Sequence, residues 1–160
     1  MTVRIGINGF GRIGRSYLRA ALANSADVEV VAVNDVTDAA TLAALLEWDS
    51  ISGHLDGVAV AGDAIRVGDR SIAVLLSRDP ATIPWGDHGA DVVIESTGLF
   101  TDAARARAHL SGGARKVIVS APAKGDVPTF VLGVNDSALD PSASDVFSNG
   151  SCTTNSLAPL

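Results

Sequence analysis

Cysteine is almost absent from this sequence, which has one thiol, Cys152, among 160 residues. A single cysteine excludes a disulfide within the chain, and this usage is typical of a cytoplasmic protein. Basic residues are also few, and 12 Lys and Arg against 18 Asp and Glu give a net charge of −6. An acidic chain gains no free energy by displacing the counterions of DNA or RNA, so we expect no nucleic-acid partner.

Long hydrophobic runs are missing as well. No apolar stretch reaches the roughly 18 residues that span a bilayer, so we expect no membrane partner. The first ten residues, MTVRIGINGF, lack the arrangement of a signal peptide. With 47% hydrophobic and 19% charged residues, the composition is that of a globular protein with the length of one domain.

Short apolar segments rich in Val and Ile recur along the chain, as is typical of strands that are covered on both faces. We expect such strands at residues 3–8, 28–34, 91–96, 116–120, 129–133 and 145–149. Segments with helical periodicity separate the early strands, and we expect helices at 12–23, 41–48 and 101–110, the last beginning at Thr101 as its cap. This alternation predicts an α/β fold of the Rossmann type, with a doubly wound and mainly parallel sheet.

Residues 57–77 break this alternation. They read GVAVAGDAIRVGDRSIAVLLS, with Gly-Asp pairs between short apolar segments, and we interpret them as a short antiparallel insertion. No repeat or flexible linker interrupts the rest. We therefore expect one domain over residues 1–150, with residues 151–160 as the start of a further helix.

The turn after the first expected strand carries a glycine fingerprint. Gly9, Gly11 and Gly14 form a G-x-G-x-x-G pattern between a strand and a helix, and Asp35 ends the second strand about 20 residues further on. The first glycine permits a tight turn, the second lets the backbone approach a diphosphate, and the third lets helix and strand pack closely. The amino end of the helix favours an anion, and the acidic residue can accept hydrogen bonds from ribose hydroxyls. This context predicts a dinucleotide site that prefers NAD over NADP.

The segment SNGSCTTN, residues 148–155, places the only thiol where a strand gives way to a helix. A helix amino end favours a thiolate, and the hydroxyls of Ser151, Thr153 and Thr154 add donors for an anion. Such a thiolate could add to an aldehyde. Two plainer readings stay open: Cys152 as a small core residue, and the hydroxyls as simple helix caps.

These motifs resemble the glyceraldehyde-3-phosphate dehydrogenase family, the phosphorylating and NAD-dependent enzymes of glycolysis. GINGFGRIGR at the start and SCTTN near the end match most closely, and VND, WDSISG, RDP, ESTGLF and SAPAKGD follow in the family's order. The resemblance covers the whole chain, but the family's subunit is about twice as long. The chain therefore looks like the cofactor domain, cut just inside the helix that carries the cysteine.

The resemblance implies NAD-dependent oxidation of glyceraldehyde 3-phosphate to 1,3-bisphosphoglycerate, through a thiohemiacetal and a thioester on Cys152. Ser151 and Thr153 would bind the substrate and inorganic phosphate, without a metal ion. The full protein would be a cytoplasmic homotetramer, and the 160-residue chain alone would be inactive. The cofactor site that the resemblance implies consists of Asn8, Gly9, Phe10, Gly11, Arg12, Ile13, Asp35, Arg78, Thr97, Gly98 and Ser120.

The chain departs from the family's usual SNASCTTNC at Gly150 and Ser156, and the sequence does not explain the glycine. The catalytic base is also missing. We expect His54 in a loop, His88 in a turn and His109 on a helix between arginines and alanines to be surface residues and not catalytic ones. In the family, the catalytic histidine lies in the half that this chain lacks. Two alternatives remain: a stand-alone NAD-binding module without catalysis, and a relative that acts on erythrose 4-phosphate.

Overall fold

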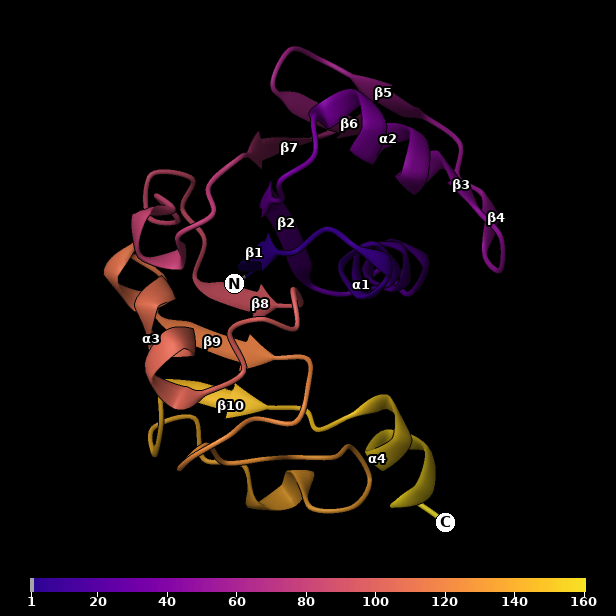
Figure 1. Ribbon diagram of the computed structural model, residues 1–160. Coiled ribbons are helices and arrows are strands. Elements are labelled where there is room, and N and C mark those ends of the chain that lie inside the picture. Colours follow the sequence, from indigo (N-terminus) through magenta and orange to yellow (C-terminus); the bar gives the residue numbers. More distant parts are fainter. Residues whose placement is uncertain (1) are drawn as a thin grey trace.

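One eight-stranded sheet organises the chain, and the computed structural model describes residues 2–160. Helices cover both faces of this sheet (Figure 1). Its strands are β1 (Val3–Asn8), β2 (Val28–Asn34), β5 (Val58–Val60), β6 (Ala64–Val67), β7 (Arg70–Leu75), β8 (Val92–Glu95), β9 (Lys116–Val119) and β10 (Val146–Ser148). The helices are α1 (Arg12–Ala23), α2 (Ala39–Glu47), α3 (Ala103–Ser111) and α4 (Cys152–Leu157), and the short pair β3 (Trp48–Asp49) and β4 (Gly53–His54) forms a separate hairpin.

The strand order is β10-β9-β8-β1-β2-β7-β6-β5, and all neighbours from β10 to β7 are parallel. The chain winds outward from β1 through β2 to β7, then returns to β8 on the other side of β1. This is the order of a Rossmann domain, whose ligands bind where the winding reverses. The predicted doubly wound α/β fold is confirmed, and the reversal lies between β1 and β8.

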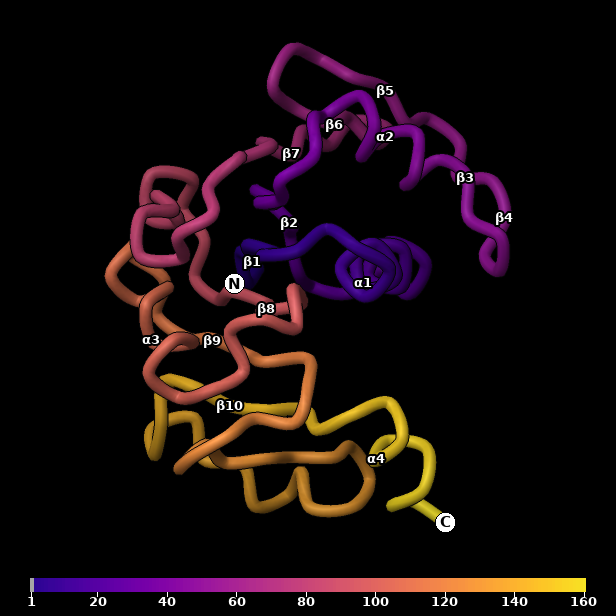
Figure 2. The backbone as a smooth tube through the Cα atoms, in the orientation of Figure 1, coloured from indigo at the N-terminus to yellow at the C-terminus, as the bar shows by residue number. Residues whose placement is uncertain are grey.

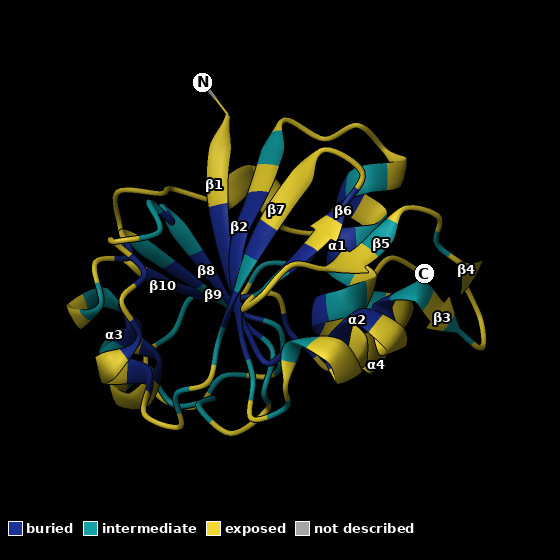
Figure 3. Ribbon diagram, turned by 90° about the horizontal axis from the view of Figure 1, so that it is seen from above, coloured by how far each residue is buried: buried dark blue, intermediate teal, exposed yellow. Residues whose placement is uncertain are grey.

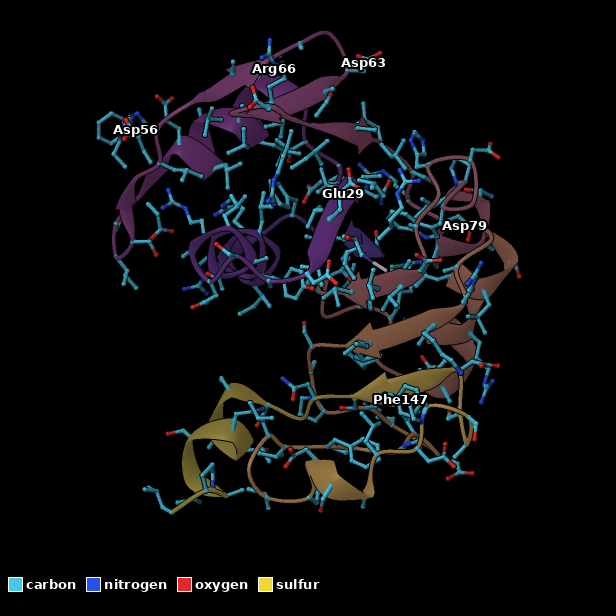
Figure 4. The ribbon with its side chains drawn as sticks, turned by 180° about the vertical axis from the view of Figure 1, so that it is seen from behind. Glu29, Asp56, Asp63, Arg66, Asp79 and Phe147 are labelled. Atoms are coloured by element: carbon cyan, nitrogen blue, oxygen red, sulfur yellow. The ribbon has the colours of Figure 1, made fainter. Side chains whose placement is uncertain are left out.

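The antiparallel insertion predicted at residues 57–77 is also confirmed. β5 pairs antiparallel with β6, and β6 pairs antiparallel with β7. β7 then pairs in parallel with β2, so this part of the insertion also supplies the third strand of the wound sheet. Figure 4 labels Asp63 and Arg66 at the β5–β6 edge and Phe147 on β10 near the opposite edge.

Two local expectations are wrong. Residues 129–133 form no strand, because only Thr129 bridges to Ser148 before the chain turns at Gly133, where φ is +77°. Helix α3 is capped by Asp102 and not by Thr101, since the Asp102 carboxylate accepts a hydrogen bond from the Arg105 backbone N–H at 3.0 Å. The carboxylate of Asp102, one residue after the predicted cap, accepts the hydrogen bond from the first turn of α3 in place of the Thr101 hydroxyl.

The core lies on both faces of the sheet. α1 buries Gly14, Leu18 and Ala21 against one face, and α3 buries Ala106 and His109 on the other. The strands β1 and β2 are exposed at their amino ends and buried at their carboxyl ends (Figure 3). The backbone tube ends at α4, beyond β10, on the same side of the sheet as α1 (Figure 2). Within residues 2–160, no helix has both the length and the apolarity needed to cross a membrane.

Candidate dinucleotide-binding site

A pocket of about 330 Å³ opens at the carboxyl ends of the central strands, where the winding reverses. Backbone turns and polar side chains that follow β1, β2, β7 and β8 form its walls. The residues that line it are Asn8, Gly9, Gly11, Asn34, Asp35, Val36, Ser77, Arg78, Ser96, Thr97, Leu99 and Phe100.

The three glycines of the fingerprint have three different structural reasons. Gly9 has φ of +88°, and a Cβ there would lie 2.7 Å from the Thr97 backbone nitrogen. A Cβ on Gly14 would lie 2.4 Å from the Gly9 carbonyl oxygen, so this glycine lets α1 approach β1. At Gly11, no atom that could obstruct a Cβ lies within 4 Å in the described chain. Gly11 also lines the pocket, so its backbone is accessible to a diphosphate.

The amino end of α1 is also available to an anion. Gly11 is the N-cap and contributes no side-chain hydrogen bond to the first turn. The first N–H groups of a helix lack partners within the helix, and together with the helix dipole they favour a negative group. The turn and the helix end therefore fit a dinucleotide diphosphate.

Asp35 is held rigidly at the end of β2. One carboxylate oxygen accepts a hydrogen bond from the Phe10 backbone N–H at 2.8 Å, and the other accepts from the Val36 backbone N–H at 2.7 Å. The side chain is half-buried, and each oxygen keeps a lone pair for a further donor. The exposed Arg78, which the resemblance also placed in the cofactor site, lines the same pocket.

A buried histidine that the sequence analysis misplaced lies behind the pocket residue Asn8, next to Glu95. His109 has an exposed fraction of 0%, contrary to the surface position we expected. Its Nε2 lies 3.0 Å from Glu95 Oε2, and its Nδ1 accepts a hydrogen bond from Trp85 Nε1 at 3.0 Å. His54 is exposed as expected and lies near Glu47 and Asp56. His88 is partly buried.

The predicted cofactor residues divide into two groups. Asn8, Gly9, Gly11, Asp35, Arg78 and Thr97 line the pocket, whereas Phe10, Arg12, Ile13, Gly98 and Ser120 do not. The Phe10 ring lies in the core, and only its backbone N–H reaches Asp35. Ser120 donates hydrogen bonds from its backbone N–H and hydroxyl to the Glu95 carbonyl oxygen at 3.0 and 3.1 Å.

The sequence analysis missed six lining residues. Five of them directly adjoin predicted residues in the sequence, so a position next to a predicted residue was a usable signal. The missed residues are Asn34, Val36, Ser77, Ser96, Leu99 and Phe100.

Cys152 is the first residue of α4 and is exposed. The predicted helix start is confirmed, and the reading of this thiol as a core residue is wrong. Ser151 caps the helix, since its hydroxyl accepts a hydrogen bond from the Thr154 backbone N–H at 2.9 Å. Gly150 has φ of +68°, a conformation that favours glycine. The residues described as lining the pocket include none from α4.

Fold, glycine turn and pocket together define a dinucleotide-binding domain of the Rossmann class. Residues 3–103 match the family described as glyceraldehyde 3-phosphate dehydrogenase, NAD binding domain. The chain belongs to this family, and NAD is its cofactor.

Curated relatives agree with this assignment. The chain is 60% identical to glyceraldehyde-3-phosphate dehydrogenase 1 of Streptomyces arenae, with 100% of this chain and 48% of the relative covered. It is 59% identical to glyceraldehyde-3-phosphate dehydrogenase of Mycobacterium avium, with 100% and 49% covered, and 55% identical to that of Streptomyces coelicolor, with 100% and 48% covered. The chain thus spans about half the length of the curated relatives it matches.

Proposed function

We propose that the protein oxidises glyceraldehyde 3-phosphate to 1,3-bisphosphoglycerate, with NAD as oxidant and inorganic phosphate as second substrate. One observation carries this proposal: an exposed cysteine begins a capped helix in the same chain as a glycine-turn pocket with an acidic residue at the end of β2. The names of the relatives support the choice of substrate.

NAD would bind at the point where the winding reverses. Gly11 and the amino end of α1 would hold its diphosphate, with Arg12 and Ile13 on either side. Asp35 would accept hydrogen bonds from the hydroxyls of the adenosine ribose at the end of β2, and Thr97 would border the path to the nicotinamide. Asn8, Gly9 and Phe10 shape the floor and the turn between the two halves.

The outer residues border the two ends of the cofactor. Arg78 follows β7 and would lie near the adenine. Gly98 and Ser120 follow β8 and β9 and border the path to the nicotinamide. The pocket residues fit this arrangement, because Gly11 is open toward it and the Asp35 oxygens keep free lone pairs.

Cys152 is the nucleophile. Its sulfur adds to the aldehyde carbon, and the resulting thiohemiacetal carries the hydrogen that leaves as hydride. Bound NAD supplies the hydride acceptor. The remaining thioester is cleaved by inorganic phosphate, which releases the acyl phosphate and returns the thiolate. Ser151 and Thr153 flank Cys152 and bind the substrate and the incoming phosphate.

The general base comes from outside this chain. His109 uses both ring nitrogens in buried hydrogen bonds, and the ring nitrogens of His54 lie against Glu47 and Asp56. The relatives contain about as much sequence again as this chain matches. We therefore assign residues 1–150 to the cofactor domain and residues 151–160 to the helix that leads into a catalytic domain. The complete protein is a cytoplasmic homotetramer.

The test uses the protein as its gene encodes it. We expect NADH to form when glyceraldehyde 3-phosphate and phosphate are both supplied, and Cys152→Ser to abolish turnover with NAD affinity nearly unchanged. Erythrose 4-phosphate serves as the competing substrate. Faster turnover of that sugar would reassign the substrate, and NAD binding without any turnover would reduce the protein to a binding module.

A further inference from the structure

Every backbone carbonyl of the turn at residues 8–11 accepts a hydrogen bond. The first two carbonyl oxygens accept from the Ser96 hydroxyl, at 3.1 and 2.6 Å. The third accepts from Arg15 Nη1 at 2.8 Å, and the fourth accepts from the Arg15 backbone N–H at 3.0 Å. A carbonyl oxygen carries partial negative charge and repels an anion. A turn that holds a diphosphate therefore needs its carbonyl groups directed elsewhere.

The N–H groups of the same turn divide at Gly11. The Gly9 N–H donates to the Asn34 carbonyl oxygen at 2.8 Å, and the Phe10 N–H donates to the Asp35 carboxylate at 2.8 Å. Within residues 2–160, the Gly11 N–H donates to no acceptor. The N–H groups that follow belong to the first turn of α1, where a helix offers them no partner. The turn thus leaves donors free for an anion, and no carbonyl oxygen.

The Phe10 carbonyl and the Gly11 N–H belong to one planar peptide group, in which they point in opposite directions. Rotation of this plane changes ψ of Phe10 and φ of Gly11. The present φ of Gly11 is −72°, but a glycine accepts both signs of φ at little cost. The glycine that opens the turn to a ligand therefore also leaves the plane free to turn over. That rotation would direct the Phe10 carbonyl toward the diphosphate.

Arg15 provides the side-chain hydrogen bond that opposes this rotation. It lies on the first turn of α1, and helical side chains lean toward the amino end of their helix, which brings its guanidinium group back to the Phe10 carbonyl. The side chain is half-buried and its Nε is buried, so the charge is held against the fold. A hydrogen bond with a charged donor is about twice as strong as a neutral one. Gly11 lines the pocket, whereas Arg15 does not.

We propose that Arg15 is a positioning residue for the cofactor diphosphate: its hydrogen bond keeps the Phe10 carbonyl away from the anion and the Gly11 N–H toward it. This inference rests on the proposed placement of NAD. Arg15 acts through the backbone and needs no contact with the cofactor. Without its hydrogen bond, the plane turns over in part of the molecules, and the diphosphate meets a carbonyl oxygen. The Asp35 carboxylate is held by the preceding peptide group, so the ribose contact is kept.

The experiment compares ADP with adenosine, which lacks the diphosphate, on the protein as its gene encodes it. Arg15→Met removes the donor and keeps an unbranched side chain of similar helix propensity. We expect the dissociation constant of ADP to rise about tenfold and that of adenosine to change by less than about twofold, because one charge-assisted hydrogen bond is lost at the diphosphate end alone. The tenfold difference between variant and wild type should persist in about 1 M salt, where charges are screened beyond about 3 Å.

Arg19→Met is the matched control, because it removes the same cation from the same helix one turn further on. The Arg19 guanidinium also donates to backbone carbonyls, those of Leu46, Glu47 and Gly53, and none of these residues lines the pocket. This variant should lower the melting temperature and leave both dissociation constants within about twofold of the wild-type values.

Equal weakening of ADP and adenosine by Arg15→Met would overturn the proposal, because Arg15 would then only support the fold. An unchanged ADP affinity would also overturn it. A loss that disappears in high salt would assign Arg15 to attraction at a distance, which contradicts the proposal as well. If Arg15→Met does not fold, Arg15→Gln takes its place, since the shorter and neutral side chain does not reach the position of Nη1, and the same results are expected. Wild-type protein that bound ADP no more tightly than adenosine would contradict the proposed placement of the diphosphate, whatever the variants show.

Discussion

Alanine at Gly9 and, separately, at Gly11 should damage two different properties of the domain. At Gly9 the backbone has φ of +88°, and a Cβ would lie 2.7 Å from the Thr97 nitrogen and 2.8 Å from the Ser96 carbonyl carbon. At Gly11 φ is −72°, and no obstructing atom of the described chain lies within 4 Å of a Cβ. One substitution therefore strains the fold, and the other only adds a methyl group to an open surface.

The structure allows a magnitude for each variant. The left-handed conformation costs alanine about 1–2 kcal/mol, and the contact with backbone that cannot rotate away adds about 1–3 kcal/mol. Gly9→Ala should therefore lower the free energy of unfolding by about 2–5 kcal/mol, a large part of the 5–15 kcal/mol typical of a domain. Gly11→Ala should leave stability unchanged. Its methyl group stands where the diphosphate approaches, and losing one charge-assisted hydrogen bond weakens NAD binding by about tenfold or more.

Urea unfolding measures the first effect, and calorimetric titration with NAD measures the second. Each variant serves as the control for the other, since both add the same methyl group to the same turn. The reasoning is refuted if Gly9→Ala is as stable as the wild type, or if Gly11→Ala binds NAD with unchanged affinity.

Three further outcomes are expected. NAD should bind more tightly than NADP, because the fixed carboxylate of Asp35 repels a 2′-phosphate; titration with both cofactors checks this, and tighter NADP binding would show that Arg78 dominates. Gly6→Ala should lower the free energy of unfolding by about 1–3 kcal/mol, since its Cβ would lie 2.5 Å from the Trp85 ring; an unchanged urea midpoint would contradict the packing. Hydrogen bonds from the Thr41 backbone N–H and hydroxyl lower the pKa of Asp38 below its ordinary 3.8. The ionised cap therefore stabilises α2 at pH values above 3.8, and this stabilisation is lost as the pH falls through the lowered pKa of the folded state. Below pH 3.8, the free energy of unfolding should decrease less steeply with falling pH in Asp38→Asn than in the wild type.

The central strands could be predicted closely from the sequence, because buried parallel strands are apolar almost throughout. β1 and β2 begin and end where the Val and Ile runs do. The glycine turn was also predictable, since each glycine has a local reason that the spacing already encodes. Residues 129–133 have the same apolar character, yet they form no strand. Only Thr129 pairs with a neighbouring strand, through a single bridge to Ser148.

His109 shows what the sequence could not reveal. On its helix it stands among arginines and alanines, which is typical of a solvent-facing position. Its burial depends on Glu95 and Trp85, which come from β8 and from the loop before it and meet the histidine only in the folded sheet. The prediction of the α3 cap was wrong for a simpler reason. Thr101 and Asp102 are both residues that commonly cap helices, and the sequence alone does not distinguish between them.

The most direct test of the account asks where the acyl group is carried. The protein as its gene encodes it is mixed with glyceraldehyde 3-phosphate and NAD without phosphate. The masses of the intact protein and of its peptides are then measured by mass spectrometry. The thioester then has no phosphate to attack it, so we predict about one NADH per site and one acyl group on the peptide that contains Cys152. Adding phosphate should remove the acyl group and restart turnover. An unmodified Cys152 peptide after NADH has formed, or an acyl group on another residue, would contradict the account.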